Sequence, residues 1–401
     1  MAWSAYWWYG RPARKLIVIG VTGTKGKSTT CRLVASALEA GGNKVGMLTT
    51  VEFQIGDKRW LNDKKMTMLG KGKIQSMLKE MVKSGCKYAV VETSSEGILQ
   101  YRHIGLNYHT AVFTNLGTEH SERHGGFENL KKAKGTIFTK AKVIIANTDD
   151  QHSGYYLNFP APEKHTFGLN SQNHPEVLGE NIVSDQSGVN FTVGGNKFRL
   201  NIIGKFNVYN ALAAIAVGRS QKISDDKIAQ GLASVKLVEG RMELVEAGQD
   251  FKVIVDYAHE PMSLTELFKS LREMVGDKKV IAVVGSDGGG RDKGKREKMG
   301  ELAGRLADYV VITDVNCYDE DPTEIAEMLA KGARLAGKQD NVNLFIVVDR
   351  REGIAKAISL ADTGDAVAIT AKGTEPYIAV AGGKKIPWDD RKVAREILSL
   401  N

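Results

Sequence analysis

The chain has 401 residues, enough for two or three domains, with 42% hydrophobic and 25% charged residues. It contains no run of about 18 apolar residues, so the sequence predicts no membrane-spanning helix. The formal net charge of +8 comes from scattered Lys and Arg, which indicates a solvated basic surface rather than a nucleic-acid site. Cys31, Cys86 and Cys317 lie far apart in the sequence, which argues against a disulfide framework or a zinc ribbon and favours a cytoplasmic location.

The first 14 residues form an aromatic and basic segment. "MAWSAYWWYG" contains three of the five tryptophans and two tyrosines, and Arg11, Arg14 and Lys15 follow. This segment is too short and too aromatic for a signal peptide. Aromatic side chains next to basic ones can rest on a membrane interface, so residues 1–15 are a candidate for peripheral membrane or protein contact. An apolar segment that packs on the domain is the alternative.

Short β-branched runs then alternate with helix-period stretches, which predicts parallel sheets covered by helices. We expect strands within residues 15–23, 44–50, 88–94, 110–116 and 142–148. Residues 160–204 resemble a hairpin-like antiparallel insert, and 204–220 a helix. The pattern restarts near residue 240. The sequence therefore predicts an α/β fold, with a P-loop-type central domain over 15–238 and a Rossmann-like α/β domain over 239–401.

The stretch "VIGVTGTKGKSTT", residues 18–30, is the strongest local signal. Gly23 and Gly26 would let several N–H groups converge on one anion at the start of a helix. Lys27 would supply an ammonium for phosphate oxygens, and the Ser28 hydroxyl is placed for Mg²⁺. The usual phosphate-loop motif, G-x-x-x-x-G-K-[ST], has a glycine at the position where this chain has Val21. The alternative is a purely structural glycine-rich turn with a helix cap. The predicted strand before the turn and the predicted helix after it favour an ATP site.

Polar side chains follow the next two central strands. Glu92 ends one, and Asn115, Glu119, His120 and His124 follow the other. The carboxyl ends of parallel strands share one edge of a sheet, where ligands bind. Carboxylate and imidazole there would suit Mg²⁺, whereas imidazole alone would suggest zinc. Taken singly, Glu92 could equally be a helix cap or ion-pair partner, and His120 a surface histidine.

Ten ordered stretches resemble the Mur ligases, the ATP-dependent amino-acid-adding enzymes of peptidoglycan synthesis. They are "GVTGTKGKSTT", "VETSS", "FTNLGTEH", "ENLKKAKGTIF", "GKFNVYNALAA", "EGRMELV", "VDYAH", "GGGRDKGKR", "ITDVN" and "ITAKGTE". The resemblance covers residues 15–401 and is strongest to the subfamily that adds the third residue of the peptide. It implies ligation in the cytoplasm of an amino acid to the peptide carboxylate of a muramoyl-peptide precursor of the cell wall.

The resemblance also implies roles for single residues. The implied nucleotide-binding set is Thr22, Gly23, Thr24, Lys25, Gly26, Lys27, Ser28, Thr29, Asn115, Asn210, Arg241, Asp256 and His259. The implied metal ligands, for two Mg²⁺ ions, are Ser28, Glu92, His120 and Lys134, and the implied catalytic residues are Lys27, Glu92, His120 and Lys134. Lys134 matches the lysine that the family carbamylates into a carboxylate-like ligand. The residue pattern alone indicates a surface lysine there.

The implied reaction follows from the chemistry of a carboxylate, which is a poor electrophile. ATP would convert it into an acyl phosphate, and an amine would then attack through a tetrahedral intermediate to give an amide and phosphate. Such an enzyme mainly positions the reactants and neutralises charge.

The sequence departs from the family pattern in three places. The phosphate loop begins near residue 20, so the usual N-terminal UDP-gripping domain is expected to be lacking, and the substrate need not carry UDP.

The other two departures concern the incoming amino acid. The stretch "VNCYDEDP" has Cys317 and Tyr318 where the family has Pro-Arg or Pro-Ala. Tyr318 cannot clamp the far carboxylate of diaminopimelate as an arginine does, which favours a diamine such as lysine or ornithine, or a neutral amino acid. Thr374 replaces the family's histidine in "AKGTE".

Two other interpretations remain open. One is a Mur-like ligase acting on a substrate without UDP, as in polyglutamate or cyanophycin synthesis or in partner-dependent amidation. The other, from a different class, is a non-catalytic ATP-binding module. The intact set of Lys27, Ser28, Glu92, His120 and Lys134 argues against the module.

Overall fold

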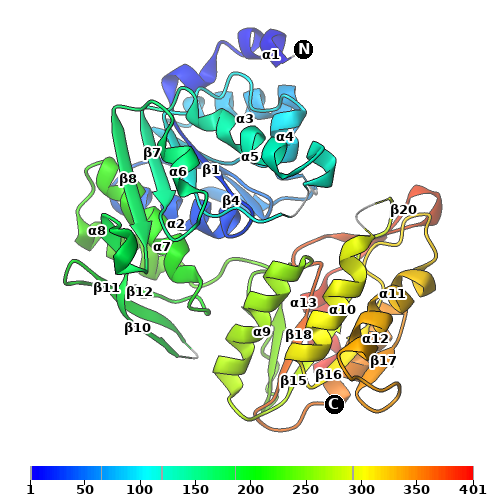
Figure 1. Ribbon diagram of the computed structural model, residues 1–401. Helices are drawn as coiled ribbons and strands as arrows, with labels where there is room; N and C mark the ends of the chain where they lie inside the picture. Colours follow the sequence, from blue (N-terminus) through cyan, green and yellow to red (C-terminus); the bar gives the residue numbers. More distant parts are fainter. Residues whose placement is uncertain (1, 65, 119–120, 186, 291–292, 401) are drawn as a thin grey trace. The chain divides into compact units, whose positions relative to one another are not determined.

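The computed structural model describes residues 2–64, 66–118, 121–185, 187–290 and 293–400 (Figure 1). The chain divides into two compact units, Met1–Val238 and Glu239–Asn401. Each unit has a mostly parallel sheet with helices on both faces, as the alternating strand and helix patterns predict. In the described ranges, no helix combines the length and the apolar composition that crossing a bilayer requires.

The first unit is built on a nine-stranded sheet of order β4-β3-β2-β5-β1-β6-β7-β8-β9. Its strands are β1 (Ile17–Thr22), β2 (Val45–Leu48), β3 (Glu52–Ile55), β4 (Lys58–Leu61), β5 (Tyr88–Glu92), β6 (Thr110–Phe113), β7 (Val143–Asn147), β8 (Glu163–Gly168) and β9 (Val177–Leu178). The seven strands β2-β5-β1-β6-β7-β8-β9, in this spatial order, are parallel to their neighbours. Strands β3 and β4 pair antiparallel at the edge next to β2. The strand predictions for this half are confirmed at β1, β2, β5, β6 and β7.

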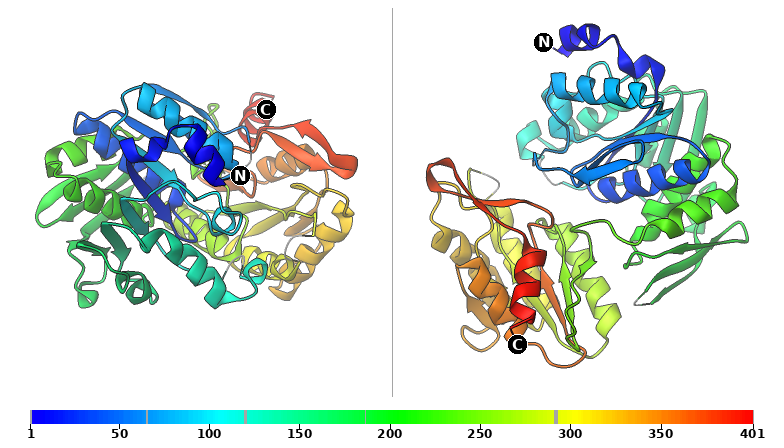
Figure 2. Two further views of the ribbon diagram at one scale, coloured as in Figure 1. Left: turned by 90° about the horizontal axis from the view of Figure 1, so that it is seen from above. Right: turned by 180° about the vertical axis from the view of Figure 1, so that it is seen from behind.

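Helices cover both faces of this sheet. They are α1 (Ala2–Trp8), α2 (Lys27–Ala40), α3 (Lys71–Lys83), α4 (Ser95–Leu99), α5 (Phe127–Gly135), α6 (Ser153–Leu157), α7 (Asn207–Ser220) and α8 (Asp225–Ser234). Ile19 and Val21 share a core with α2, α7 and α8, whereas Val18 shares one with α3, α5 and α6. Successive residues of a strand point to opposite faces, so a continuous apolar run can serve both cores. Helix α1 packs against α3 at the outside of this unit (Figure 2).

The prediction for residues 160–204 is only partly correct. β10 (Glu180–Asp185), β11 (Gly188–Val193) and β12 (Asn196–Leu200) do form a separate antiparallel sheet. Strand β8, however, pairs in parallel with β7 and belongs to the main sheet. Its sequence alternates only weakly, and Phe167 at its end is buried in the same core as α7, which draws the strand into that layer.

The second unit has a six-stranded sheet of order β13-β14-β18-β15-β16-β17, in which only β13 is antiparallel. Its strands are β13 (Glu243–Leu244), β14 (Lys252–Val255), β15 (Val280–Val284), β16 (Tyr309–Ile312), β17 (Leu344–Ile346) and β18 (Ala366–Ile369), and β19 (Tyr377–Val380) and β20 (Lys384–Pro387) form a separate hairpin. Its helices are α9 (Pro261–Val275), α10 (Gly294–Leu306), α11 (Pro322–Leu335), α12 (Arg350–Ser359) and α13 (Asp390–Leu398).

Candidate active site

The loop between β1 and α2 depends on two glycines. Gly26, at φ +77°, directly precedes α2, and Gly23 has φ +152°. A Cβ at Gly23 would lie 1.9 Å from Oγ1 of Thr114, so a larger residue does not fit without a shift. The first N–H groups of α2 have no acceptor within the helix, and the helix dipole adds partial positive charge there. The backbone of residues 23–28 therefore has the form of an anion site.

Lys27 lies over this loop. Its ammonium donates a hydrogen bond to the carbonyl oxygen of Thr24 at 2.8 Å, and its side chain is half-buried. A lysine is a point charge on a flexible stem, so the same ammonium can turn from a carbonyl to a phosphate oxygen.

The end of β6 holds the loop in place. The side-chain Oδ1 of Asn115 accepts a hydrogen bond from the backbone N–H of Lys25 at 2.8 Å. The backbone oxygen of Asn115 accepts a second hydrogen bond, from the backbone N–H of Thr24 at 2.9 Å. Thr114 donates its hydroxyl to the Lys25 carbonyl at 2.8 Å. The structure thus places Asn115, a predicted nucleotide contact, as a support of the loop backbone.

Glu92 and Ser28 lie side by side at the same edge of the sheet. The Ser28 hydroxyl donates to Oε2 of Glu92 at 2.8 Å, and the carboxylate is only 3% exposed. Thr50 donates its N–H to Oε2 at 2.8 Å and its hydroxyl to Oε1 at 2.9 Å. Thr50 was missed by the sequence analysis, although its place just after β2, at the carboxyl edge, is a signal that could have found it.

This pair has the chemistry of a magnesium site. A hydroxyl and a carboxylate oxygen are hard donors of the kind that Mg²⁺ prefers. Within the described ranges, no group of three His, Cys, Asp or Glu side chains forms a cage that could hold a metal by itself. Such a cage is not required, because Mg²⁺ commonly binds through one or two protein ligands together with substrate phosphates.

Lys134 is not the surface residue that the pattern alone indicates. It lies on α5, is 4% exposed, and donates its ammonium to the carbonyl oxygen of Gly23 at 2.7 Å. The structure therefore brings Lys134 to the phosphate-type loop, a contact between residues 111 positions apart. The predicted residues Glu119 and His120 lie outside the described residues.

His124 is also buried near this lysine. Its Nδ1 has no hydrogen-bond partner in the part of the chain that the structure describes, and the residue lies on a short turn, Glu122–His124. Burial lowers the pKa of His124, and the charge of Lys134 lowers it further. The imidazole therefore favours its neutral form.

Asn210 packs beneath the start of α2. Its Oδ1 accepts a hydrogen bond from the Thr30 hydroxyl at 3.0 Å, and a Cβ at Gly26 would lie 2.2 Å from the same oxygen. The resemblance implied an adenine contact at this position. In the structure the side chain, 5% exposed, supports the turn into α2 from below.

Arg241, Asp256 and His259 lie together in the second unit, at the end of β14. Asp256 accepts hydrogen bonds from the N–H groups of Met242 and Ala258, both at 2.7 Å. The guanidinium of Arg241 lies 4.7 Å from the ring centre of Tyr257, whose ring is 4.5 Å from that of His259. The Asp256 carboxylate thus connects the two segments that carry these side chains.

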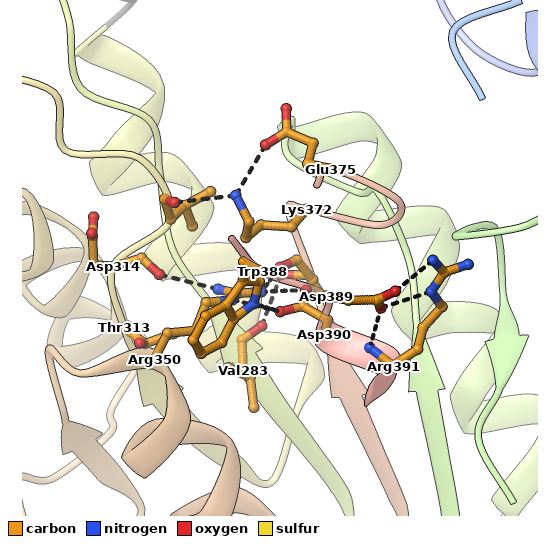
Figure 3. A network of polar contacts seen from close by, with 12 residues as sticks. Val283, Thr313, Asp314, Arg350, Lys372, Glu375, Trp388, Asp389, Asp390 and Arg391 are labelled. Carbon is orange, nitrogen blue, oxygen red and sulfur yellow. Dashed lines mark hydrogen bonds and ion pairs between the residues drawn. The ribbon is translucent and has the colours of Figure 1, made fainter. Parts of the chain in front are cut away.

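A polar network follows the ends of β15, β16 and β18 in the second unit. Asn316, 1% exposed, donates its amide to Asp287 Oδ1 at 2.7 Å and to Glu375 Oε2 at 3.0 Å. Lys372, 0% exposed, donates to the same Glu375 oxygen at 3.1 Å and to the carbonyl of Tyr377 at 2.9 Å. Figure 3 shows Lys372 and Glu375 pointing to one side of the network. These residues were not predicted from the sequence, although "AKGTE" directly follows a predicted strand.

Arg350 fixes the strand ends beneath this network. Its guanidinium is almost fully buried and makes a bidentate ion pair with Asp390, at 2.8 and 2.7 Å. It also donates to the backbone oxygen of Asp314 at 3.2 Å (Figure 3) and to that of Thr370 at 2.7 Å. Trp388 Nε1 donates to the same carboxylate at 2.7 Å. One arginine therefore connects the segments that follow β16 and β18, two strands that lie on either side of β15.

The acidic residues 319–321 are all engaged in structure. Asp319 accepts from the N–H of Gly382 at 2.9 Å, and Asp321 caps α11 through the N–H of Thr323, as an acidic helix start before proline predicts. Glu320 accepts from the N–H of Gly290 and from Arg296. These contacts lower the pKa of Glu320 to about 2.

Asp314 differs from these acids. Its Oδ1 is buried and has no hydrogen-bond partner among the described residues. Burial raises the pKa of Asp314, and a backbone hydrogen bond from Val315 and the charges of Arg350 and Lys372 oppose this rise only in part. In Figure 3 its carboxylate projects to the same side of the network as Lys372 and Glu375. A buried carboxylate oxygen without a donor is a place where a ligand's N–H or ammonium can bind.

Comparison with known families covers both units. Residues 21–218 match the model of the Mur ligase middle domain, and residues 240–373 match that of the Mur ligase, glutamate ligase domain. The chain is 37% identical to a UDP-N-acetylmuramyl-tripeptide synthetase of Roseiflexus sp., covering 98% of this chain and 80% of that protein. It is 36% identical to a UDP-N-acetylmuramoyl-L-alanyl-D-glutamate–2,6-diaminopimelate ligase of Caldanaerobacter subterraneus, covering 100% and 81%.

Solved structures have the same fold. A UDP-N-acetylmuramoyl-L-alanyl-D-glutamate–2,6-diaminopimelate ligase matches with a TM-score of 0.65 and 30% identity, covering 96% of this chain and 78% of that one. Mycobacterium tuberculosis folylpolyglutamate synthase complexed with ADP matches with a TM-score of 0.71, covering 92% and 91%, but at 17% identity this likeness concerns the fold alone.

Proposed function

Because the chain belongs to the Mur ligase family, whose members are ATP-dependent ligases, we propose that it joins an amino acid to the peptide carboxylate of a muramoyl-peptide precursor of the cell wall. The observation that carries the proposal is the loop of residues 23–28, with Lys27 over it and the Ser28–Glu92 pair at its end. This arrangement suits a triphosphate with its metal.

In this proposal the triphosphate binds the backbone N–H groups of residues 22–29, and Lys27 neutralises the phosphate that is transferred. The γ-phosphoryl group passes from ATP to the carboxylate, which gives an acyl phosphate and ADP. The amine then attacks the acyl carbon, the carbon–oxygen bond to phosphate breaks, and the amine loses a proton. Loop and lysine mainly position the reactants and offset their charge.

Magnesium fits the Ser28–Glu92 pair, whose oxygens already lie 2.8 Å apart. When bound, Mg²⁺ would supply positive charge that offsets the charge of the phosphates. We assign a second ion to His120 and Lys134, the latter in its carbamylated form. The burial of Lys134 at the Gly23 carbonyl supports this assignment, because a surface lysine would not reach the phosphates. Asn115, Asn210, Arg241, Asp256 and His259 complete the proposed nucleotide-binding set.

The added amino acid is proposed to be a diamine such as lysine or ornithine. Tyr318 offers no guanidinium for a second carboxylate, and the unpartnered Oδ1 of Asp314 suits an ammonium. The acids 319–321 are committed to the structure and do not support this preference.

The test is a panel of amino acids with UDP-muramoyl-dipeptide and its UDP-free analogue, followed by phosphate release and product mass. We expect phosphate release to require both an acyl acceptor and an amino acid, with lysine or ornithine above diaminopimelate. The Tyr318→Arg variant should move the preference toward diaminopimelate, and Tyr318→Phe should not. Phosphate release that is indifferent to both co-substrates would overturn the ligase proposal, and a preference for diaminopimelate in the unaltered chain would overturn the diamine.

A further inference from the structure

Helix α1 presents its tryptophans outward. Trp3, Trp7 and Trp8 are 59%, 61% and 84% exposed, whereas Ala2 and Tyr6 on the opposite side of the helix are buried. Three large aromatic side chains on one short, solvent-facing helix are costly to leave in water, because each could bury substantial apolar area.

The helix is fixed on the first unit. Tyr6 packs on Gly105, where an added Cβ would lie 2.7 Å from its ring, and its hydroxyl accepts a hydrogen bond from the side-chain amide of Asn107 at 3.2 Å. Residues about a hundred positions apart therefore hold α1 in one orientation. The tryptophans are presented by the fold rather than carried on a loose tail.

A hollow of about 730 Å³ lies beside α1. It is lined by Trp8 and Tyr9 from the N-terminal segment, by Lys71 at the start of α3, and by Gln100 and Arg102 just after α4. Leu99 and Tyr101, 46% and 60% exposed, belong to that same turn. The apolar surface therefore extends from α1 across neighbouring segments.

The charge around this surface is mostly positive. The described residues of 2–16, 63–80 and 96–109 include three, four and one Lys or Arg, against Asp63, Glu80 and Glu96. Glu96 accepts a hydrogen bond from Gln100 of the hollow. Cations also lie over the aromatic rings: Arg11 is 4.6 Å from the Trp7 ring centre, Lys71 is 5.6 Å from that of Tyr101, and Lys79 is 5.8 Å from that of Tyr9. Basic and aromatic side chains thus alternate over one surface.

We propose that this α1 surface, formed by Trp3, Trp7, Trp8 and Tyr101 with Arg11, Lys71 and Lys79, binds the interface of an anionic lipid bilayer. Tryptophan rings settle at the level of the lipid headgroups, and Lys and Arg are attracted to acidic phospholipids. The excess of positive charge beside exposed aromatic rings favours an anionic bilayer, because acidic headgroups attract Lys and Arg across the whole surface. The inference is independent of the ligase proposal.

The experiment is sedimentation of the full chain with two kinds of vesicle, phosphatidylcholine alone and phosphatidylcholine mixed with phosphatidylglycerol. We expect binding to the anionic vesicles only, weakened as salt is raised. The triple variant Trp3→Ser/Trp7→Ser/Trp8→Ser should bind roughly tenfold or more weakly. The double variant Lys71→Gln/Lys79→Gln should also bind several-fold more weakly. Trp60→Ser is the matched control, since Trp60 is exposed on β4 of the same unit.

ATP affinity in the absence of vesicles shows that each variant is folded, and it should not change. The proposal is overturned if the full chain ignores anionic vesicles, or if the triple variant binds them as well as the Trp60→Ser control. It is equally overturned if the chain self-associates without lipid and the triple variant abolishes that, because the surface would then bind a second copy. None of these outcomes depends on turnover.

Discussion

The two units build their polar loops by different means. In the first, residues 23–28 are shaped by glycines and helix N–H groups, and Lys27 is half-buried over backbone oxygens. In the second, residues 314–318 are shaped by side chains from distant segments, and Lys372 is fully enclosed by Asn316, Glu375 and the Tyr377 carbonyl.

This difference separates a lysine that can move to a ligand from one that holds a structure. A partly exposed ammonium with a backbone partner can change partners at small cost, whereas an enclosed one gives up several hydrogen bonds and its ion pair with Glu375 when it moves. Removal of Lys27 should therefore reduce activity much more than stability, and removal of a buried group that supports the second loop should show the reverse balance.

The largest effect is expected at Lys27. Lys27→Ala should lower kcat/KM by roughly 1,000-fold or more, because the charge on the transferred phosphate loses its cation. The free energy of unfolding should change by less than about 0.5 kcal/mol. Phosphate release and urea denaturation measure the two quantities, with the exposed Lys140→Ala as control. Turnover close to that of the unaltered chain would break the comparison.

Arg350 tests the second loop from below. Arg350→Met leaves the buried carboxylate of Asp390 without its partner, so the free energy of unfolding should fall by about 3–5 kcal/mol. Arg351→Met removes an exposed pair with Glu396 and should cost no more than about 1 kcal/mol. Urea denaturation compares the two; equal losses would show that the buried pair does not hold the strand ends.

Gly23 tests the backbone of the first loop. Gly23→Ala must place a Cβ against Thr114 at a positive φ, so we expect a loss of about 2–4 kcal/mol in unfolding free energy together with weaker ATP binding. Gly42→Ala also has a positive φ but meets no atom within 4 Å, and it should cost about 1 kcal/mol with ATP affinity unchanged. Titration with ATP decides whether the loop is as tightly fitted as its geometry indicates.

The smallest effect concerns pH. The pKa of Glu320 is about 2 in the folded chain, against a usual 4.5, so its carboxylate stabilises the fold above about pH 4.5 and loses that contribution as pH falls toward 2. Its side chain is 22% exposed, so Glu320→Gln should cost under about 1 kcal/mol at neutral pH. The variant should also flatten the dependence of unfolding free energy on pH between 2 and 4.5, and the exposed Glu246→Gln should not. An unchanged slope would contradict this account.

The sequence indicated the alternation of strands and helices, the loop at 23–28 and the place of Ser28 and Glu92, because each of these depends on a local pattern. It did not indicate that residues 163–168 join the main sheet, since neighbouring strands and helices decide where a weakly patterned strand pairs. Nor did it find Thr50, Asp314 or Arg350, whose significance depends on contacts between segments far apart in the chain.

By itself, the sequence determined the family, the fold class and the phosphate-type loop, because glycine spacing and apolar periodicity act over a few residues. Only the tertiary structure decided that Lys134 is buried against the Gly23 carbonyl, that Lys372 is enclosed, and that the tryptophans of α1 face solvent. Burial and hydrogen bonding depend on segments that folding brings together. The sequence alone therefore does not distinguish a buried lysine or tryptophan from an exposed one.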